Sequence, residues 1–448
     1  MDKVKDGFSR RRFLGTTAAA AAFTIVPRHV LGGPGFVPPS EKLNIAGIGI
    51  GGQGRGDMRH VASENIVALC DIDDNLAAKS YNMFPKARQW KDYRRMLEEQ
   101  KDIDAVVIAT GDHLHAAITM MALKMKKHVF CEKPLTHSVY EARQISKAAK
   151  EASVATQMGN QGQAGEATRR LREVIWDGAI GDVTEVHVWT DRPNKGLTGV
   201  HWPQGVARPK DTPPVPSHID WDLFCGPAPL RPYHPAYHPF RWRGWLDFGT
   251  GAMGDMGCHL LDPIFRVLKL GHPLTVQAVS SRVNKETYPL ASIIKYEFPA
   301  RGDMGAVKLT WYDGGMKPHR PEELEDGRKM GNGGTLFIGT KGKILDGRII
   351  PESKQAKYKL PPKTLVRSPG HFEEWINACK GGDRAGSNFD FAGPLTEVVL
   401  LGNVALRMEL KEQMCKHKLH WDPQAFKITN LPEANQFLHR EYRQGWTL

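Results

Sequence analysis

The sequence feature that most constrains the fold is a glycine-rich turn that directly follows a short apolar run. Residues 43–48 have the composition of a buried strand, and Gly49-Ile50-Gly51-Gly52-Gln53-Gly54 follows them in the pattern G-x-G-x-x-G. The glycines permit a sharp turn and bring bare backbone close to a pyrophosphate, whose charge the N-terminus of the next helix favours. The pattern therefore predicts a strand–turn–helix unit that binds a dinucleotide.

An acidic residue at the end of the next apolar run supports this prediction. Residues 66–70 form that run, and Asp71 follows them, 22 residues after Gly49. A carboxylate at this place accepts hydrogen bonds from the adenine ribose hydroxyls. Because Asp71 and Asp73 would repel a 2′-phosphate, we expect NAD as the cofactor rather than NADP.

Strand-like and helix-like segments then alternate along the chain. Residues 104–110 are an apolar strand, residues 111–126 a helix, and residues 128–131 a further strand that leads into Glu132-Lys133-Pro134. This alternation is typical of a doubly wound parallel sheet. Ligands bind such a sheet at the carboxyl ends of its strands, where Asp71, residues 110–115 and residues 132–134 are expected to lie.

The pattern changes to period two from residue 183, which indicates half-buried strands. Strand-like runs are expected at residues 183–190, 274–283, 291–298, 306–312 and 335–338, and helices at residues 371–380 and 394–411. We predict an α/β protein in which an N-terminal Rossmann domain precedes an α+β domain with a large, mostly antiparallel open sheet. The expected boundaries are 1–40 for a signal and linker, 41–160 for the NAD-binding domain, 161–430 for the α+β domain and 431–448 for a tail.

The first forty residues carry the pattern of an export signal. Ser9-Arg10-Arg11-Arg12-Phe13-Leu14 is a twin-arginine string, and the weakly apolar residues 15–26 follow it. About 12 such residues are too few to span a bilayer core that needs about 20, so no stable membrane span is expected after export. The sequence predicts a periplasmic protein, with a disordered basic leader as the alternative. Because the periplasm holds little nicotinamide cofactor, export favours a tightly bound one.

Charge and cysteine content exclude other classes of function. The net charge is +12, of which residues 1–32 supply four, and the rest is spread without a basic stripe, so no nucleic-acid partner is expected. The six cysteines form no CxxC pair and predict neither a disulfide framework nor a zinc site. Ligand-type residues occur at His113/His115, at His234/His238 and at Asp255, His259 and Asp262. The first pair belongs to the dinucleotide loop, Pro235 interrupts the second, and the third group has a redox role, so no metal is predicted.

Five ordered motifs resemble those of the glucose–fructose oxidoreductase, inositol dehydrogenase and rhizopine catabolism family (Gfo/Idh/MocA). They are the glycine-rich turn, residues 109–115, Glu132-Lys133-Pro134, Gly159-Asn160-Gln161 and residues 255–262. The resemblance implies that Lys133, Asp255 and His259 surround the nicotinamide as catalytic residues, and that the Lys133–Pro134 bond is cis. The cofactor-binding residues expected from the motifs are Gly49, Gly51, Gly52, Gln53, Gly54, Asp71, Thr110, Asp112, His113, His115, Glu132, Lys133, Asn160 and Gln161.

The spacing of Asp255 and His259 fits acid–base chemistry. If residues 254–267 are helical, the two side chains are i, i+4 neighbours, and the carboxylate can orient the imidazole. His259 would accept the proton of a substrate hydroxyl, while Lys133 stabilises the negative charge that develops on the oxygen. Which of Lys133 and His259 is the principal base is left open.

A long segment rich in Pro, His and Trp, residues 192–250, interrupts the second domain. Such segments are usually functional, and Arg and aromatic groups suit a sugar ring. The predicted substrate-binding residues are Lys133, Arg192, His201, Trp202, Trp242, Asp255 and His259. The alternative is that the aromatic side chains pack as a satellite core or against another subunit.

Together these observations predict an NAD-dependent oxidoreductase that transfers a hydride between a sugar, cyclitol or glycoside hydroxyl carbon and the nicotinamide. One alternative is a glycoside-cleaving enzyme that works through a transient keto-sugar, and a second is a non-catalytic dinucleotide-binding protein. The resemblance also implies a homodimer or homotetramer assembled through the open sheet.

Overall fold

A computed structural model describes residues 41–448, except residues 197, 283 and 413–416. The twin-arginine string and Cys415 lie outside the described residues. The other five cysteines are free thiols.

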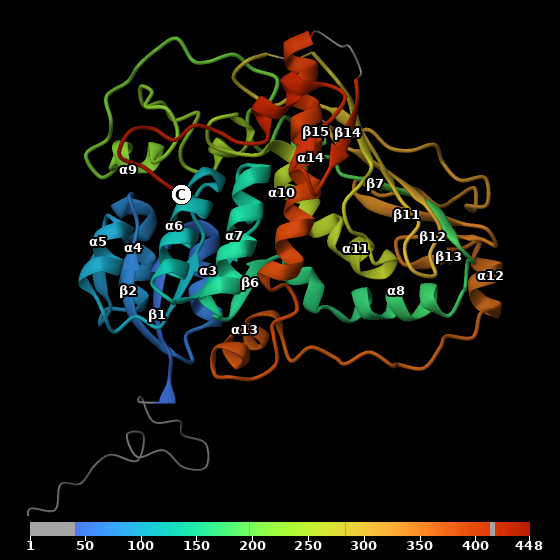
Figure 1. Ribbon diagram of the computed structural model, residues 1–448, viewed down its shortest axis with the longest axis horizontal. Helices are drawn as coiled ribbons and strands as arrows, with labels where there is room; N and C mark the ends of the chain where they lie inside the picture. The colour runs from blue at the N-terminus through green and yellow to red at the C-terminus, as the bar shows by residue number, and fades with distance from the viewer. Residues whose placement is uncertain (1–40, 197, 283, 413–416) are drawn as a thin grey trace, which may run out of the picture. The chain divides into compact units, whose positions relative to one another are not determined.

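The N-terminal sheet has six strands in the order β3-β2-β1-β4-β5-β6, and all neighbouring pairs are parallel. Its strands are β1 (Asn44–Ile48), β2 (Asn65–Cys70), β3 (Arg88–Trp90), β4 (Ala105–Ile108), β5 (His128–Glu132) and β6 (Thr156–Gly159). Most of their apolar residues are buried because helices cover the sheet (Figure 1). This is the doubly wound arrangement that the sequence predicts.

Polar caps set where several connecting helices begin. These helices are α3 (Gly52–His60), α4 (Asp74–Met83), α5 (Tyr93–Glu99), α6 (Asp112–Lys124) and α7 (Val139–Ala152). Asp73 caps α4, Asp92 caps α5, and Ser138 with Glu141 forms a capping box on α7. Each cap satisfies backbone N–H groups that the first turn of a helix leaves without a partner.

The turn between β1 and α3 requires its glycines. Gly49 has a φ of +78°, which side chains disfavour. A Cβ on Gly54 would lie 1.9 Å from the carbonyl oxygen of Gly49, so the helix can pack this closely on the strand only without a side chain. The close packing of α3 on β1 therefore fixes the backbone conformation of the glycine-rich turn.

The second sheet has nine strands in the order β13-β12-β11-β7-β10-β9-β8-β14-β15. They are β7 (Val183–Trp189), β8 (Thr275–Ser280), β9 (Ser292–Phe298), β10 (Val307–Tyr312), β11 (Gly334–Gly339), β12 (Lys343–Leu345), β13 (Arg348–Ile350), β14 (Lys418–Asp422) and β15 (Lys427–Ile428). Strands β7 and β10 pair in parallel, and the other pairs are antiparallel. The prediction of a large, mostly antiparallel sheet is confirmed.

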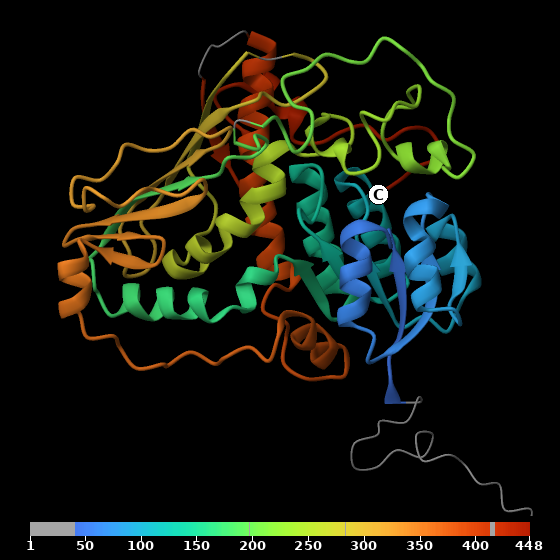
Figure 2. The ribbon, with the colours of Figure 1, turned by 180° about the vertical axis from the view of Figure 1, so that it is seen from behind.

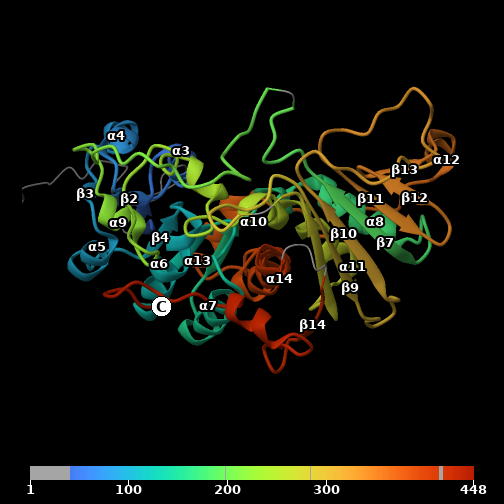
Figure 3. The ribbon, with the colours of Figure 1, turned by 90° about the horizontal axis from the view of Figure 1, so that it is seen from above.

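Helix α14 (Phe389–Glu412) packs against both halves of the described chain. It contacts α7 beside the first sheet and β8 of the second, and it lies between the two sheets in Figure 3. Residues 389–408 are apolar and long enough to span a membrane, but 83% of the window is buried, which is typical of a core helix. The buried Glu397 of α14 binds Arg143 of α7 at 2.6 Å. One continuous hydrophobic core includes residues of both sheets.

The remaining helices are α8 (Glu166–Trp176), α9 (Trp221–Cys225), α10 (Gly251–Leu260), α11 (Asp262–Leu268), α12 (Glu352–Lys357) and α13 (His371–Cys379), with short 3-10 turns η2 (Gln161–Ala164), η3 (Arg241–Gly244) and η4 (Pro432–Phe437). The expectation of a single helix over residues 254–267 is wrong. Helix α10 ends at Leu260, and a second helix, α11, begins at Asp262 with Pro263 in its first turn. Asp255 and His259 both lie on α10.

Candidate active site

A cavity of about 460 Å³ lies at the carboxyl ends of β1, β2, β4 and β5. Gly49, Gly51, Gly52 and Gln53 of the turn line it, while Gly54 serves the packing of α3 on β1. No side chain caps α3 at its N-cap residue Gly51. The first turn of α3 therefore keeps backbone N–H groups for an anionic ligand, and the cavity fits the pyrophosphate that the sequence predicts.

Asp71 lines the same cavity and is tied to the turn. Its Oδ2 accepts a hydrogen bond from the backbone N–H of Gly51 at 3.1 Å, and its Oδ1 accepts one from Asp73 at 3.0 Å. Burial raises the pKa of Asp71, an effect that these two hydrogen bonds oppose. The carboxylate is thus positioned beside the turn, as a ribose-binding acid requires.

Asp73, which the sequence places near the cofactor with Asp71, does not line the cavity. Its carboxylate caps α4 and lies 2.9 Å from His238 Nε2 and 3.0 Å from His218 Nδ1. Although burial alone would raise the pKa of Asp73, its hydrogen bonds with His238 and the backbone of Leu76 lower it to about 2. Asp73 therefore binds the 192–250 insertion to the nucleotide domain, and Asp71 remains as the acid facing the cofactor site.

The loop after β4 divides into residues that line the cavity and residues that do not. Thr110 and His115 line it, and the ring nitrogens of His115 lie 2.7 Å from the carbonyl oxygen of Pro134 and 3.2 Å from that of Thr110. His115 thereby links this loop to the Lys133–Pro134 bond, which is cis as the resemblance implies.

Asp112 and His113, which the sequence predicts to bind the cofactor, do not line the cavity, and their side chains bind residues of the insertion. Asp112 accepts a hydrogen bond from the hydroxyl of Thr250, and burial raises its pKa to about 7. The ring nitrogens of His113 lie 2.7 and 3.0 Å from the carbonyl oxygens of Phe224 and Phe248, and burial lowers its pKa to about 3. These contacts hold the insertion to the nucleotide domain, and Figure 2 shows the insertion (green) above that domain.

Glu132 and Gln161 meet at the end of β5. Gln161 donates a hydrogen bond to Glu132 at 2.7 Å, and both residues line the cavity. Burial, followed by the charge of Asp57, raises the pKa of Glu132. Asn160 does not line the cavity, because its side chain donates to Asp262 at 2.9 Å and joins η2 to α11. In this structure the side chain of Asn160, which the sequence predicts to bind the cofactor, binds Asp262.

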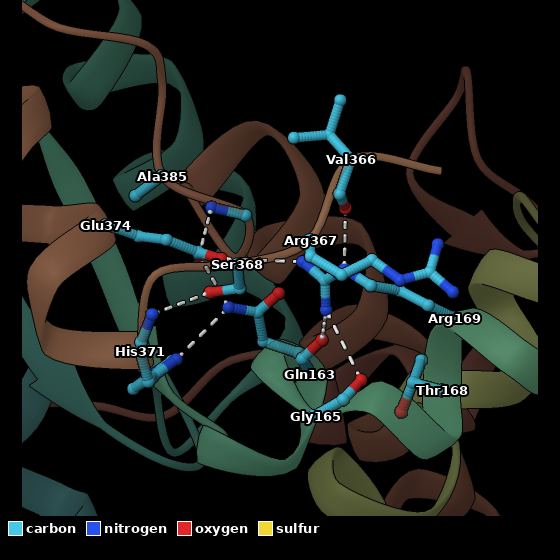
Figure 4. Close-up of polar contacts among 12 residues, drawn as sticks. Gln163, Gly165, Thr168, Arg169, Val366, Arg367, Ser368, His371, Glu374 and Ala385 are labelled. Atoms are coloured by element: carbon cyan, nitrogen blue, oxygen red, sulfur yellow. Dashed lines mark hydrogen bonds and ion pairs between the residues drawn. The ribbon is translucent and has the colours of Figure 1, made fainter. Parts of the chain in front are cut away.

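A polar network holds η2, the turn that carries Gln161 (Figure 4). Gln163 donates to Glu374 at 2.7 Å and lies 3.1 Å from Nδ1 of His371. Arg169 donates to the backbone oxygens of Gln163 at 3.0 Å and Val366 at 2.8 Å. Sequence reasoning missed this support because its partners lie about two hundred residues further along the chain.

Lys133 and Arg243 hold the carboxylate of Asp255 between them. Lys133 Nζ lies 2.9 Å from Asp255 Oδ1, and Arg243 Nε lies 3.0 Å from the same oxygen. Burial alone would raise the pKa of Asp255, but the two cations hold it well below its usual range. Burial would lower the pKa of Lys133, but the charges of Asp255 and Glu132 raise it overall. Lys133 is thus a fixed ammonium group at the cavity wall.

His259 lines the cavity one helical turn after Asp255. Within the described part of the chain, no hydrogen bond joins the imidazole to Asp255, because the carboxylate that was expected to orient it accepts from Lys133 and Arg243. Burial, followed by the charge of Lys133, lowers the pKa of His259 to about 4. The ring is therefore neutral at neutral pH.

The insertion supplies both a wall of the cavity and a satellite core. Trp242 lines the cavity as predicted, with Phe240 and Arg243, which the prediction omitted. The Arg243 guanidinium stacks 4.1 Å from the ring centre of Phe240 and 4.3 Å from that of Trp242. Residues 241–243 (Arg-Trp-Arg) lie inside the insertion that the sequence identifies, but the sequence does not show that Arg243 contacts Asp255. The satellite core contains Ile219, Trp221, Phe224, Cys225, Ala228, Tyr237, Trp245 and Phe248.

Four predicted substrate-binding residues do not line this cavity: Asp255, which lies behind Lys133 and Arg243, and Arg192, His201 and Trp202. Arg192 pairs with the neighbouring Asp191 at 2.6 Å. Trp202 is buried and donates to Gln204 at 2.8 Å, and His201 packs beside it. Within the described residues, no group of three His, Cys, Asp or Glu side chains is arranged to hold a metal ion.

The fold and the cavity define a two-domain protein with a Rossmann-type nucleotide site and a lysine–aspartate pair beside it. Two family models match the chain: the oxidoreductase family NAD-binding Rossmann fold over residues 42–160, and the C-terminal alpha/beta domain of the same family over residues 165–448. The chain belongs to the Gfo/Idh/MocA oxidoreductase family, and its N-terminal domain is the NAD-binding Rossmann domain of that family.

Among the curated proteins, the chain is similar to an inositol 2-dehydrogenase and to a levoglucosan dehydrogenase. An inositol 2-dehydrogenase of Salmonella paratyphi B is 29% identical over 146 residues, 31% of this chain and 43% of that protein. A levoglucosan dehydrogenase of Pseudarthrobacter phenanthrenivorans is 29% identical over 264 residues, 58% of this chain and 53% of that protein. The chain thus spans about half the length of these relatives.

Among solved structures, the WlbA dehydrogenase of Bordetella pertussis in complex with NADH and UDP-GlcNAcA has a TM-score of 0.58 at 17% identity. The likeness covers 85% of this chain and 99% of that one. It supports the two-domain fold.

Replacing Asp71 with serine is expected to raise the Kd for NAD about 10–100-fold, because hydrogen bonds to a charged group contribute about 1.5–3 kcal/mol. The preference for NAD over NADP should fall at the same time, since the repelling charge is gone. Isothermal titration with both nucleotides measures the two effects. Asp74→Ser, which removes a surface carboxylate paired with Lys91, is the matched control. An unchanged Kd for NAD would show that Asp71 does not bind the ribose.

Proposed function

We propose that this protein is an NAD-dependent oxidoreductase that transfers a hydride between a hydroxyl-bearing carbon of a sugar, cyclitol or glycoside and the nicotinamide. The observation that carries the proposal is that Lys133 and His259 line the same cavity as the glycine-rich turn and Asp71. A ligand bound along the turn therefore extends toward a fixed cation and a neutral imidazole.

The residues at this end of the cavity suit the oxidation of an alcohol. NAD held in this cavity would supply the hydride acceptor. Lys133, kept charged by Asp255, donates a hydrogen bond to the substrate oxygen and stabilises its developing negative charge. His259 accepts the hydroxyl proton, because of the two groups only the neutral imidazole has a free lone pair at neutral pH. This assigns the base that the sequence left open.

Arg243 positions the other groups. It shares Asp255 with Lys133 and is itself fixed between two aromatic rings. The arrangement fixes the carboxylate, and through it the ammonium group of Lys133, before substrate arrives. Such preorganisation is the main source of electrostatic stabilisation in enzymes.

The assignment of His259 predicts a specific pH dependence. A protonated imidazole cannot accept a proton, so kcat/KM for alcohol oxidation should fall as the pH drops through about 4, instead of near the ordinary histidine value of about 6.5. Asp112 also titrates near neutral pH, so the readout is the difference between wild type and His259→Gln. The limb near pH 4 should vanish in the variant and persist in the control His201→Gln. A limb that persists in His259→Gln would assign the base elsewhere.

The activity is tested by offering the purified protein NAD with a panel of aldoses, inositols, anhydro-sugars and glycosides, and by following nicotinamide reduction. Parallel assays with p-nitrophenyl glycosides separate the alternatives. Release of nitrophenol without net reduction would favour glycoside cleavage through a keto-sugar. NAD binding without turnover of any compound would favour the non-catalytic alternative.

We also propose that the protein is exported through its twin-arginine string and assembles as a homodimer or homotetramer through the second sheet. Replacing Arg10, Arg11 and Arg12 with lysine should retain the full chain in the cytoplasm. Light scattering of the purified protein measures the oligomeric state, and a monomer would overturn the proposal about assembly.

A further inference from the structure

Two segments from distant parts of the chain close one end of the cavity. Asp71 marks where the adenine ribose is expected, and Ile72, Leu76 and Tyr93 line the cavity with it. Leu223 and Phe224 of α9, together with Trp446 near the end of the chain, line the same cavity. Neither α9 nor the segment 432–448 belongs to the nucleotide-binding sheet, and both cross to it from the second domain (red and green in Figure 1).

Trp446 is fixed against the nucleotide domain. Its ring centre lies 6.3 Å from that of Tyr93, and the Arg94 guanidinium carbon lies 4.3 Å from the centre of the indole. Arg94 is itself held by Asp92, with 2.7 Å between Nη2 and Oδ2. Only 8% of Trp446 is exposed, although it lies on a surface segment. The indole is therefore a rigid apolar wall of the cavity.

The segment that carries Trp446 is also anchored to α9. Arg443 donates from Nε to the carbonyl oxygen of Gly226 at 3.0 Å and pairs with Asp222 at 2.5 Å. The backbone N–H of Trp446 donates to the carbonyl oxygen of Arg443 at 3.0 Å. Further back, Arg440 binds Glu141 of α7 at 2.8 Å. Helix α9 and Trp446 thus form one connected roof over this end of the cavity.

We propose that Trp446, supported by Arg94 and joined to α9 by Arg443, is an adenine-binding residue that retains NAD as a resident cofactor. The inference rests on the NAD site proposed above. An aromatic wall beside the ribose-binding acid suits stacking on the adenine ring. Because Leu223 and Phe224 of α9 cover the same end, the nucleotide leaves only when the α9–Trp446 roof is displaced. Release is then slower than from an open nucleotide site.

The test measures the release of reduced nucleotide from the full-length protein by its nicotinamide fluorescence, after a chase with excess NAD. Trp446→Ala should speed NADH release about 5–150-fold, the range that loss of base–aromatic stacking produces. Trp446→Phe keeps an aromatic ring and should therefore release NADH nearly as slowly as the wild type. Reduced nicotinamide mononucleotide, which lacks the adenosine half, should leave wild type and Trp446→Ala at the same rate. Trp176→Ala, a change at a partly exposed tryptophan on α8, is the control.

The outcomes separate the inference from the proposed function. If wild type binds no NADH, both fail. If NADH binds and leaves Trp446→Ala at the wild-type rate, only the inference fails. Equal acceleration for the mononucleotide would also overturn it, because the change would then loosen the whole cavity. Should Trp446→Ala not fold, Arg94→Ala removes the support of the indole and should speed NADH release in the same selective way.

Discussion

Replacing Lys133 with methionine is expected to lower kcat about 10²–10³-fold and to leave the Kd for NAD within about threefold of wild type. Removing one preorganised donor to a developing oxyanion costs about this much in other enzymes. The variant should fold, since Arg243 still binds Asp255 after the ammonium group is lost. Cofactor binding should persist because the glycine-rich turn and Asp71 are unchanged.

Steady-state kinetics with the best substrate of the panel, together with titration of NAD, measure both quantities. Lys150→Met, at an exposed site on α7, is the control for loss of a lysine charge. Wild-type turnover in Lys133→Met would remove Lys133 from the chemistry. A parallel loss of NAD binding would instead show that the residue holds the cofactor.

Replacing Asp255 with asparagine is expected to lower both stability and activity. The side chains of Asp255, Lys133 and Arg243 are only 13%, 14% and 16% exposed, so the variant leaves two cations close together with little solvent. Removing one partner from a buried ion pair typically costs about 3–5 kcal/mol of unfolding free energy. The pKa of Lys133 should fall, because the charge of Asp255 is the first effect that raises it against burial. As the pH is raised, kcat of the Asp255→Asn variant should therefore begin to fall at a lower pH than kcat of the wild type.

Urea unfolding and the alkaline limb of kcat measure these effects. The double variant Asp255→Asn/Arg243→Met removes one of the two cations and should recover much of the lost stability. If the single variant is as stable as wild type, the carboxylate does not serve to hold the two cations together. Recovery of stability without recovery of activity would separate the structural role of Asp255 from its effect on Lys133.

The sequence predicts the parts of this molecule that depend on local pattern. The G-x-G-x-x-G turn, Asp71 and the apolar runs predict the parallel sheet, since each depends on neighbouring residues. The strands β12, β13 and β15 are only two or three residues long and show no alternation that could predict them. The break at Leu261 was missed because the apolar pattern continues through it.

The contacts of polar residues were harder to predict, because their partners are set by tertiary structure. An i, i+4 spacing brings Asp255 and His259 to one region of α10, but the insertion places Arg243 against the carboxylate. In the same way, Asp112 and His113 follow a strand as cofactor-binding residues do, yet the insertion supplies closer partners in Thr250, Phe224 and Phe248. Trp446 is distant in sequence from every motif.

The hydrophobic core that runs unbroken between the two sheets has a consequence for how substrate enters. Domains within one chain usually meet through a modest, polar interface and can swing apart about a hinge. Here α14 is buried between the sheets, and a swing would expose its apolar side chains to water. The insertion and the 432–448 segment are held to the nucleotide domain by buried polar contacts with Asp73 and Glu141 and by apolar packing. We therefore expect substrate and cofactor to enter and leave without a separation of the two sheets.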